Sequence, residues 1–278
     1  MTTIYSTDEA IVCALARDFR NGEVGFTGLA TGEAAARYIT ALPLAAMELA
    51  RQSHAPDLTI LFAGWLINPD LSQLDALPTA EFAAELRRLP CEAMMQTYPG
   101  PYAVRRGDVD FGFGSGVQVD RHGNVNSTLI GDPARPDVAL VGSILLPEHM
   151  SLFGREYLMI PHHNPRVLVG QVDYVSGVGF PGGRRGRADL GIGLPRPGDG
   201  GPRWIVTPMG IFGFDEEGQA QPAYRHADIE PAALAESTGF PVGDLTGLPT
   251  TPPPTADELD LLRRVIDPRG LLVRRPQI

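Results

Sequence analysis

The sequence predicts an α/β fold in which a largely parallel open sheet carries helices on its faces. Helical patterns alternate with short apolar runs over residues 1–90, which is the order expected of strand–helix units. Strand-forming segments then dominate residues 109–224. The chain has 278 residues, 43% of them hydrophobic, which is enough for one large domain or two small ones.

The first helix is expected to begin at Ser6, because residues 6–9 (Ser-Thr-Asp-Glu) match a capping box. Apolar residues follow at helical spacing, and Asn21-Gly22 ends the helix. Thr31 can cap a second helical region. Pro43 either divides this region or lies in the first turn of a new helix. The other elements expected in this part are strands at residues 23–28 and 58–63 and a helix at residues 79–89.

Short strands are expected through the middle of the chain. Residues 212–214 are expected to form a hairpin with residues 219–224 across Glu216-Glu217-Gly218. The glycine-rich residues 177–201 are expected to form a long loop. The remaining expected elements are strands at 109–113, 117–119, 124–130, 138–142, 166–173 and 203–208 and a short helix at 231–237.

A second capping box, residues 255–258 (Thr-Ala-Asp-Glu), begins the last helix, and Asp267-Pro268 ends it. Residues 249–255 form a polyproline-like spacer before that helix. The predicted organisation is one α/β domain over residues 1–248. The spacer and the last helix, residues 249–278, are expected to pack on the same domain.

Composition argues against several classes of function. The formal net charge is −10 and the pI is near 5.0, so neither nucleic acid nor an anionic membrane is an expected partner. No apolar run reaches the ~18–20 residues of a membrane span, and the N-terminus does not match a signal peptide. Cys13 and Cys91 are expected to be buried thiols in a reducing cytoplasm. Lysine is absent, which excludes a lysine Schiff base and a phosphate-loop lysine.

Glycines between two expected strands give the first candidate binding segment. Gly114, Ser115 and Gly116 follow an apolar run, and glycines there let backbone N–H groups approach a phosphate or a developing oxyanion. The alternative is a glycine-rich crossing of two closely packed strands. No helical pattern follows directly, so the segment does not match a dinucleotide-binding fingerprint.

The next segment reads as a hairpin with Gly123-Asn124 at its turn. Asn124 and Asn126 alternate with Val125, so their amides share one face and could bind a ligand. His122 lies at the tip and is expected to be solvated rather than catalytic.

Histidines and arginines supply two further candidates. His162 and His163 are adjacent, with His149 thirteen residues before His162, but adjacent strand residues point to opposite faces and no carboxylate is nearby, so no metal site is expected. Arg184, Arg185 and Arg187 are concentrated in the glycine-rich loop. They are candidates for phosphate recognition, with solvated loop charge as the alternative.

Residues 117–126, Val-Gln-Val-Asp-Arg-His-Gly-Asn-Val-Asn, resemble an element of the β subunits of class I CoA-transferases. The family's pattern continues at residues 172–179 and reappears at 253–259 and 265–268. The pattern is most similar to the β subunits of a branch of this superfamily that cleaves steroid rings carried on a CoA thioester.

The resemblance implies the α/β fold that this superfamily shares with ribose-5-phosphate isomerase. It implies an α partner subunit, with α2β2 the expected assembly, and CoA that enters as part of the substrate, with no permanently bound cofactor or metal. The lining of the substrate and CoA is expected at Gly114, Ser115, Gly116, Gln118, Asn124 and Asn126, with Arg184 and Arg185 as candidate phosphate contacts.

Two departures from the family pattern affect the chemistry. Transferases of this class place a nucleophilic glutamate at the end of a buried strand, and Phe62 occupies that position here. The family's glycine-pair turn, which builds an oxyanion hole, matches residues 141–147, where the pair is missing. The chain is therefore expected to be active only with an α subunit that supplies the acidic residue.

Three functions remain open. The first is hydrolytic C–C cleavage of a cyclic dicarbonyl CoA thioester in a degradation pathway. The second is CoA transfer between carboxylic acids, with the nucleophile in the α subunit. The third is a non-catalytic partner that only completes the fold of its mate.

Overall fold

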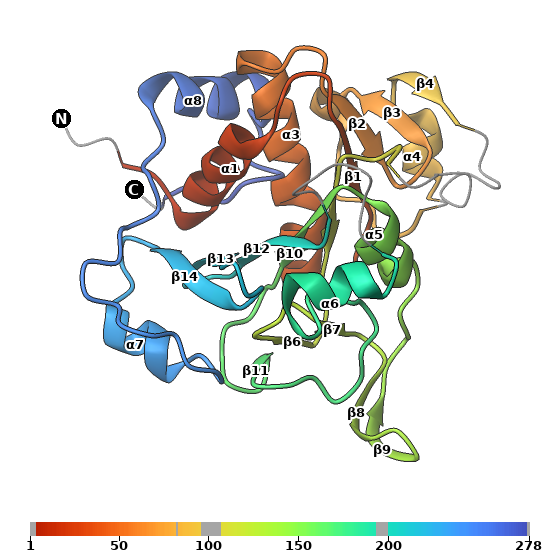
Figure 1. Cartoon of the computed structure of the whole chain (residues 1–278). Coiled ribbons are helices and arrows are strands. Elements are labelled where there is room, and N and C mark those ends of the chain that lie inside the picture. The colour runs from red at the N-terminus through yellow and green to blue at the C-terminus, as the bar shows by residue number, and fades with distance from the viewer. Residues whose placement is uncertain (1–3, 82, 96–106, 193–199, 277–278) are drawn as a thin grey trace. The chain divides into compact units, whose positions relative to one another are not determined.

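The computed structural model describes residues 4–81, 83–95, 107–192 and 200–276. The chain divides into two compact units (Figure 1). Unit 1 contains Met1–Arg105 and Thr251–Ile278, and unit 2 contains Arg106–Thr250. The C-terminal segment thus belongs to the same unit as the N-terminal one, while the expected assignment of residues 1–248 to one domain stays a prediction.

Unit 1 contains a mixed sheet with strand order β1-β2-β3-β4, in which β1 and β2 are parallel and β3 and β4 are antiparallel to their neighbours. Helix α1 packs against α3. The elements are α1 (Thr7–Asp18), β1 (Val24–Thr27), α2 (Glu33–Ala36), the π-helix η1 (Arg37–Ala41), α3 (Leu42–Ser53), β2 (Thr59–Phe62), β3 (Leu66–Pro69), η2 (Leu71–Gln73), α4 (Ala84–Arg88), β4 (Cys91–Met94), α8 (Ala256–Asp260) and the π-helix η4 (Leu261–Ile266).

Unit 2 contains a sheet with strand order β14-β13-β12-β10-β5, in which β5, β10 and β12 are parallel and β13 and β14 form an antiparallel hairpin. A small sheet, β11-β6-β7, and the hairpin β8–β9 complete it. The elements are β5 (Phe111–Gly114), β6 (Gln118–Asp120), β7 (Val125–Asn126), β8 (Leu129–Asp132), β9 (Arg135–Ala139), α5 (Leu146–Leu152), β10 (Arg155–Met159), β11 (Leu168–Val169), α6 (Gly183–Asp189), β12 (Pro202–Val206), β13 (Gly210–Phe214), β14 (Ala220–Arg225) and α7 (Pro231–Glu236).

The predicted α/β class is confirmed, as are both capping boxes. Ser6 and Thr255 each accept the backbone N–H of the glutamate three residues later, and that glutamate accepts the N–H of the cap. The predicted hairpin is also present as β13–β14. Capping boxes and tight hairpins depend on residues only a few positions apart in the chain. They can therefore be predicted directly from the sequence.

Several predictions about individual elements are wrong. Gly32, not Thr31, caps α2. Of the two alternatives for Pro43, the second is confirmed, because proline lies in the first turn of α3, which follows η1 directly. The helix expected at residues 79–89 is the short α4 in the described part of that range. The loop expected at residues 177–201 contains α6. Strand β10 was not predicted, because two charged residues begin it.

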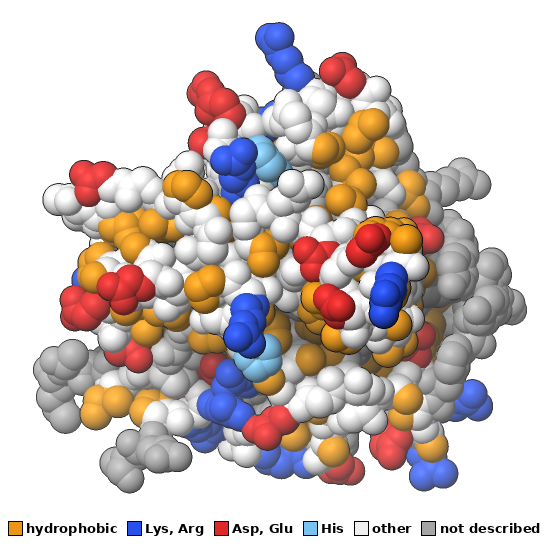
Figure 2. Space-filling view, turned by 90° about the horizontal axis from the view of Figure 1, so that it is seen from below, with side chains coloured by type: hydrophobic (Ala, Val, Ile, Leu, Met, Phe, Trp, Pro, Cys, Tyr) orange, Lys and Arg blue, Asp and Glu red, His pale blue; other side chains and the backbone are white. Residues whose placement is uncertain are grey.

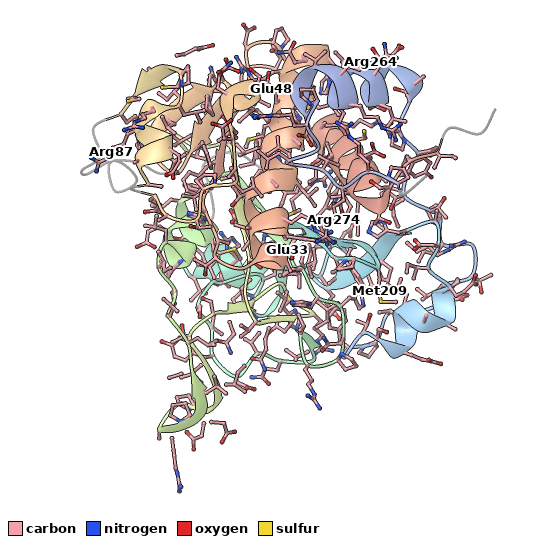
Figure 3. All side chains as sticks on the ribbon, turned by 180° about the vertical axis from the view of Figure 1, so that it is seen from behind. Glu33, Glu48, Arg87, Met209, Arg264 and Arg274 are labelled. Carbon is pink, nitrogen blue, oxygen red and sulfur yellow. The ribbon has the colours of Figure 1, made fainter. Side chains whose placement is uncertain are left out.

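One buried carboxylate binds several backbone groups near the end of the chain. Asp267, 4% exposed, follows η4 and accepts the backbone N–H groups of Leu271 at 2.7 Å, Leu272 at 3.0 Å and Val273 at 2.9 Å. The chain then returns to α2, where Arg274 forms an ion pair with Glu33 (Figure 3). No helix of the described residues is long and apolar enough to cross a membrane.

Replacing Asp267 by alanine is expected to lower the free energy of unfolding by about 2–3 kcal/mol, because three backbone N–H groups, two of them buried, lose a charged acceptor. Asp260→Ala is the control, since that carboxylate forms an exposed i,i+4 ion pair with Arg264 and its loss should cost only about 0.3–0.5 kcal/mol. Urea unfolding measures both values. Equal losses for the two variants would contradict this role of Asp267.

Candidate functional site

The predicted hairpin turn of unit 2 is present between β6 and β7, where Gln118 pairs with Asn126 and Val119 with Val125. Gly123 adopts a positive φ of 71° in the turn. The Asp120 carboxylate fixes the turn by accepting the backbone N–H groups of His122 and Asn124 and the side-chain amide of Asn124, at 2.9–3.0 Å.

The three predicted amide residues of this hairpin are buried and bond to protein groups. Asn126 donates to Gln118 Oε1 at 2.8 Å and to the Leu129 carbonyl at 2.6 Å. Gln118 also bonds to Asp173, through its own amide at 3.2 Å and through the Asp173 N–H at 3.0 Å. These bonds hold the hairpin, and the ligand-lining role of Gln118, Asn124 and Asn126 stays a prediction.

The same bonds bring together the two sequence elements that carried the resemblance. Asn124 Oδ1 accepts the Gly179 N–H at 2.9 Å, and Val125 forms an antiparallel bridge with Gly177. Residues 117–126 and 172–179 are therefore adjacent in unit 2, although about 50 residues separate them in the chain.

Close packing explains why glycine occupies the positions just before the hairpin. A Cβ atom at Gly114 would lie 2.6 Å from Oε1 of Glu156, and one at Gly116 would lie 2.5 Å from the Asn126 carbonyl oxygen. Close packing, the alternative considered for this segment, therefore accounts for both glycines. Ser115 between them is half-buried, and its side chain bonds to none of the described residues. A ligand role for the three residues is not tested by this packing.

A group of hydroxyls, which the sequence did not single out, lies beside these elements. Thr128 Oγ1 is 3.0 Å from Ser143 Oγ and 2.7 Å from Ser176 Oγ. The residue after Ser143, Ile144, is 73% exposed and has a φ of 46°, which a β-branched residue rarely adopts. The loop before α5 is therefore strained and apolar at its surface.

Exposed apolar residues flank that loop in the described part of unit 2. They come from the segment before β6, the loop before α5 and the segment after β11, and they are Val117, Val141, Ile144, Tyr174 and Val175. Figure 2 shows apolar side chains interspersed with charged ones on one face of the molecule.

In unit 1, Phe62 ends β2 and is fully buried. The turn that follows has two successive positive φ angles, 53° at Ala63 and 77° at Gly64. The Ala63 N–H donates to the Thr27 carbonyl at 2.9 Å, which ties the turn to the neighbouring strand β1. A strained turn thus follows β2, with a buried phenylalanine before it.

The histidine pair does not act as a unit. His162 is exposed, while His163 lies between two hydroxyls, with Nδ1 2.8 Å from Thr207 Oγ1 and Nε2 3.0 Å from Thr238 Oγ1. Among the residues described, no three histidine, cysteine or acidic side chains are grouped as metal ligands. His163 thus joins Thr207 to Thr238 through its ring nitrogens, which is a structural role.

The three arginines of the glycine-rich region differ in environment. Arg184 donates to the carbonyls of Asp215 and Phe214 and lies over the Phe180 ring, while Arg185 is exposed. All three lie on α6 rather than on a loop, so that expectation is wrong, and Arg187 is 3% exposed. Helix α6 turns its side chain inward, where it bonds to carbonyls.

Comparison with curated proteins identifies the family. The chain is 30% identical to the B-type subunit of the 3-oxoadipate CoA-transferase of Pseudomonas knackmussii, over 93% of this chain and 92% of that protein. This chain belongs to the class I CoA-transferase superfamily, as a subunit of the B type. It is 28% identical to the B-type subunit of the glutaconate CoA-transferase of Acidaminococcus fermentans, over 99% of this chain and 97% of that protein. No family model matches the chain.

Proteins that are named for reactions other than CoA transfer are about as similar in sequence to this chain. The cholesterol ring-cleaving hydrolase IpdB subunit of Rhodococcus jostii is 28% identical over 99% of both chains.

Among solved structures, glutaconate CoA-transferase from A. fermentans has a TM-score of 0.75 at 27% identity, covering 98% of both chains. The decarboxylase AibA/AibB has 0.73 at 26% identity, covering 96% of this chain and 98% of that one.

Acid is expected to destabilise unit 2 through its buried histidines. Burial lowers the pKa of His163 to about 4, and burial also lowers the pKa of His226. Because the folded state favours the neutral ring, this stability is present above the unfolded pKa near 6.5 and is lost as pH falls toward 4. The loss from His163 is on the order of 2–3 kcal/mol between pH 7 and pH 4.

Urea unfolding at a series of pH values checks this expectation. The variant His163→Gln keeps one donor and one acceptor between Thr207 and Thr238 but does not titrate. Its stability should fall less steeply with acid than that of the wild type. The same slope in both proteins would show that His163 does not titrate with unfolding.

Proposed function

We propose that this chain is the B-type subunit of a heteromeric enzyme that acts on an acyl-CoA, and that the reaction is hydrolytic C–C cleavage of a cyclic dicarbonyl thioester. The relatives at 28–30% identity are named as subunits of CoA-transferases and of a cholesterol ring-cleaving hydrolase. The CoA thioester and the partner subunit follow from that shared family, and the reaction follows from this chain's own residues.

Phe62 is the observation that carries the choice of reaction. By resemblance, this position holds the nucleophilic glutamate of transferases. The Phe62 side chain is fully buried and has no atom that can attack a thioester. A glutamyl-CoA intermediate therefore cannot form at this position, which favours hydrolysis over transfer.

In the proposed reaction, a carboxylate of the partner subunit takes a proton from water, and the hydroxide adds to a ring carbonyl carbon. The bond between that carbon and the neighbouring α-carbon breaks, and its electron pair forms the enolate of the second carbonyl. The carboxylic acid then returns the proton to the enolate carbon. The ring opens to a carboxylate, and the thioester stays intact.

This chain would line the substrate and stabilise the enolate. Ser115 and the backbone of Gly114 and Gly116 are the groups assigned to contact, since the Ser115 hydroxyl has no described partner. Gln118, Asn124 and Asn126 would act by holding this segment. Arg185 is the freer of the two candidate phosphate contacts, because the Arg184 guanidinium bonds to two carbonyls.

Two alternatives each have an observation in their favour. CoA transfer with a nucleophile from the partner is favoured by the 30% identity to a 3-oxoadipate CoA-transferase subunit. A non-catalytic role is favoured by the internal bonds of the three amides.

Co-expression with an A-type subunit of the same superfamily separates these functions. Ring opening of a cyclic dicarbonyl thioester without loss of CoA supports the proposal, and CoA transfer to a free carboxylate supports the first alternative. A complex that keeps full activity whatever is changed at residues 114–126 of this chain supports the second alternative.

No covalent CoA adduct is expected on this chain. Incubation of the complex with its acyl-CoA, followed by hydroxylamine and mass analysis of peptides, should leave every carboxylate of this chain unlabelled, because Phe62 replaces the nucleophile. A glutaconate CoA-transferase treated in parallel is the positive control for the trap. An adduct on any carboxylate of this chain would overturn the assignment of hydrolysis.

Replacing Ser115 by alanine is expected to lower kcat/KM of the complex by about 10²-fold, the typical loss of one donor to a developing oxyanion. Its melting temperature should stay within about 2 °C of wild type, since the side chain bonds to no described residue. Ser237→Ala is the matched control, because Ser237 is also a half-buried serine of unit 2 whose hydroxyl bonds to no described residue. Unchanged kcat/KM for Ser115→Ala would remove Ser115 from the site.

A further inference from the structure

A buried carboxylate lies in the middle of the sheet of unit 2. Glu156 is on β10, between the parallel strands β5 and β12, and is 1% exposed. A Cβ atom at Gly112 or at Gly114 of β5 would lie 2.6 Å from one of its carboxylate oxygens. The two glycines therefore leave the space that the carboxylate occupies.

A buried guanidinium lies close to this carboxylate. Arg187 on α6 donates through Nη1 to the carbonyls of Val178 at 2.6 Å and Gly179 at 3.2 Å, and through Nη2 to the carbonyl of Met150. It thus joins the end of α5 to the segment after β11. Neither α6 nor this role of Arg187 was predicted from the sequence.

Gly201 lies beside both residues. The Glu156 N–H donates to the Gly201 carbonyl at 3.0 Å, and a Cβ atom at Gly201 would lie 3.1 Å from Arg187 Nε. Burial raises the pKa of Glu156, and the neighbouring His149 ring and the Arg187 guanidinium oppose this shift. His149 Nδ1 is 3.5 Å from Glu156 Oε1, and its ring stacks on Phe153. A buried guanidinium is tolerated when an anion compensates its charge, and Glu156 supplies one.

We propose that Glu156 and Arg187 are positioning residues whose buried charges hold residues 176–180 against the β6–β7 hairpin. The N–H groups of this segment bond directly to the hairpin, Gly177 to the Val125 carbonyl, Gly179 to Asn124 Oδ1 and Phe180 to the His122 carbonyl. Since the hairpin carries the proposed acyl-CoA site, the charge pair sets the geometry of that site. For its effect on turnover, this inference rests on the proposed function.

Two variants in the assembled complex separate positioning from simple stabilisation. Glu156→Gln leaves the Arg187 charge without its anion, so both the melting temperature and kcat should fall, kcat by about tenfold. In Glu156→Gln/Arg187→Met both charges are gone, so the melting temperature should return toward wild type. Its kcat should stay at least tenfold low, with KM changed less than threefold, because the three carbonyls lose their donor.

Asp189→Asn is the matched control on the same helix, since that side chain is exposed and has no role in the proposed site, and it should keep the kcat and melting temperature of the wild type. Recovery of both melting temperature and kcat in the double variant would show that the pair only stabilises the fold. Wild-type values for Glu156→Gln would show that the pair contributes neither.

Amide hydrogen exchange on the same complexes tests the positioning without an assay of turnover. The amides of Gly177, Gly179 and Phe180 should exchange at least tenfold faster in the double variant, while those of β12 and β13 stay unchanged. Unchanged exchange at residues 176–180 would overturn the inference. If the wild-type complex turns over no acyl-CoA, the proposed function fails, and the exchange rates still decide the positioning role.

Discussion

The candidate site depends on hydrogen bonds between two stretches of unit 2, residues 117–126 and residues 172–179. Their backbone pairing is short, a single bridge between Val125 and Gly177. Side-chain amides and a carboxylate supply the rest, with Gln118 bound to Asp173 and Asn124 bound to Gly179. Buried amides without partners would cost free energy, so the two stretches fix one another's position. The hydroxyls of Thr128, Ser143 and Ser176 extend the same network to the strained loop before α5.

Glycine has a second use in this unit besides turns. At Gly112 and Gly114 the missing side chains leave space inside the sheet for a carboxylate from the neighbouring strand. A buried carboxylate needs compensation, and Arg187 and His149 supply it from α6 and α5. The glycine-rich strand, the buried acid and the inward-facing arginine therefore form one arrangement.

The turn after β2 shows how one family fold can host different reactions. Ala63 and Gly64 keep a left-handed turn whose conformation costs free energy at Ala63, and the residue before it is a buried phenylalanine. By resemblance this is the position at which transferases carry their nucleophile, and Phe62 has no carboxylate to offer there. Relatives of similar identity are named as transferases, a hydrolase and a decarboxylase, which agrees with a fold that tolerates changes of chemistry.

The sequence by itself determined the α/β class, both capping boxes, the β13–β14 hairpin and the turn at Gly123, because each depends on residues a few positions apart. The sequence also showed the resemblance to the family, because that resemblance consists of short motifs in a fixed order along the chain. Only the tertiary structure decided the role of Glu156 and Arg187. A charged residue in a sequence is normally expected at the protein surface. Strand β10, which buries Glu156, and helix α6, which buries Arg187, were not predicted for that reason. Burial of a charge depends on a partner far along the chain, and no local pattern states which residue that partner is.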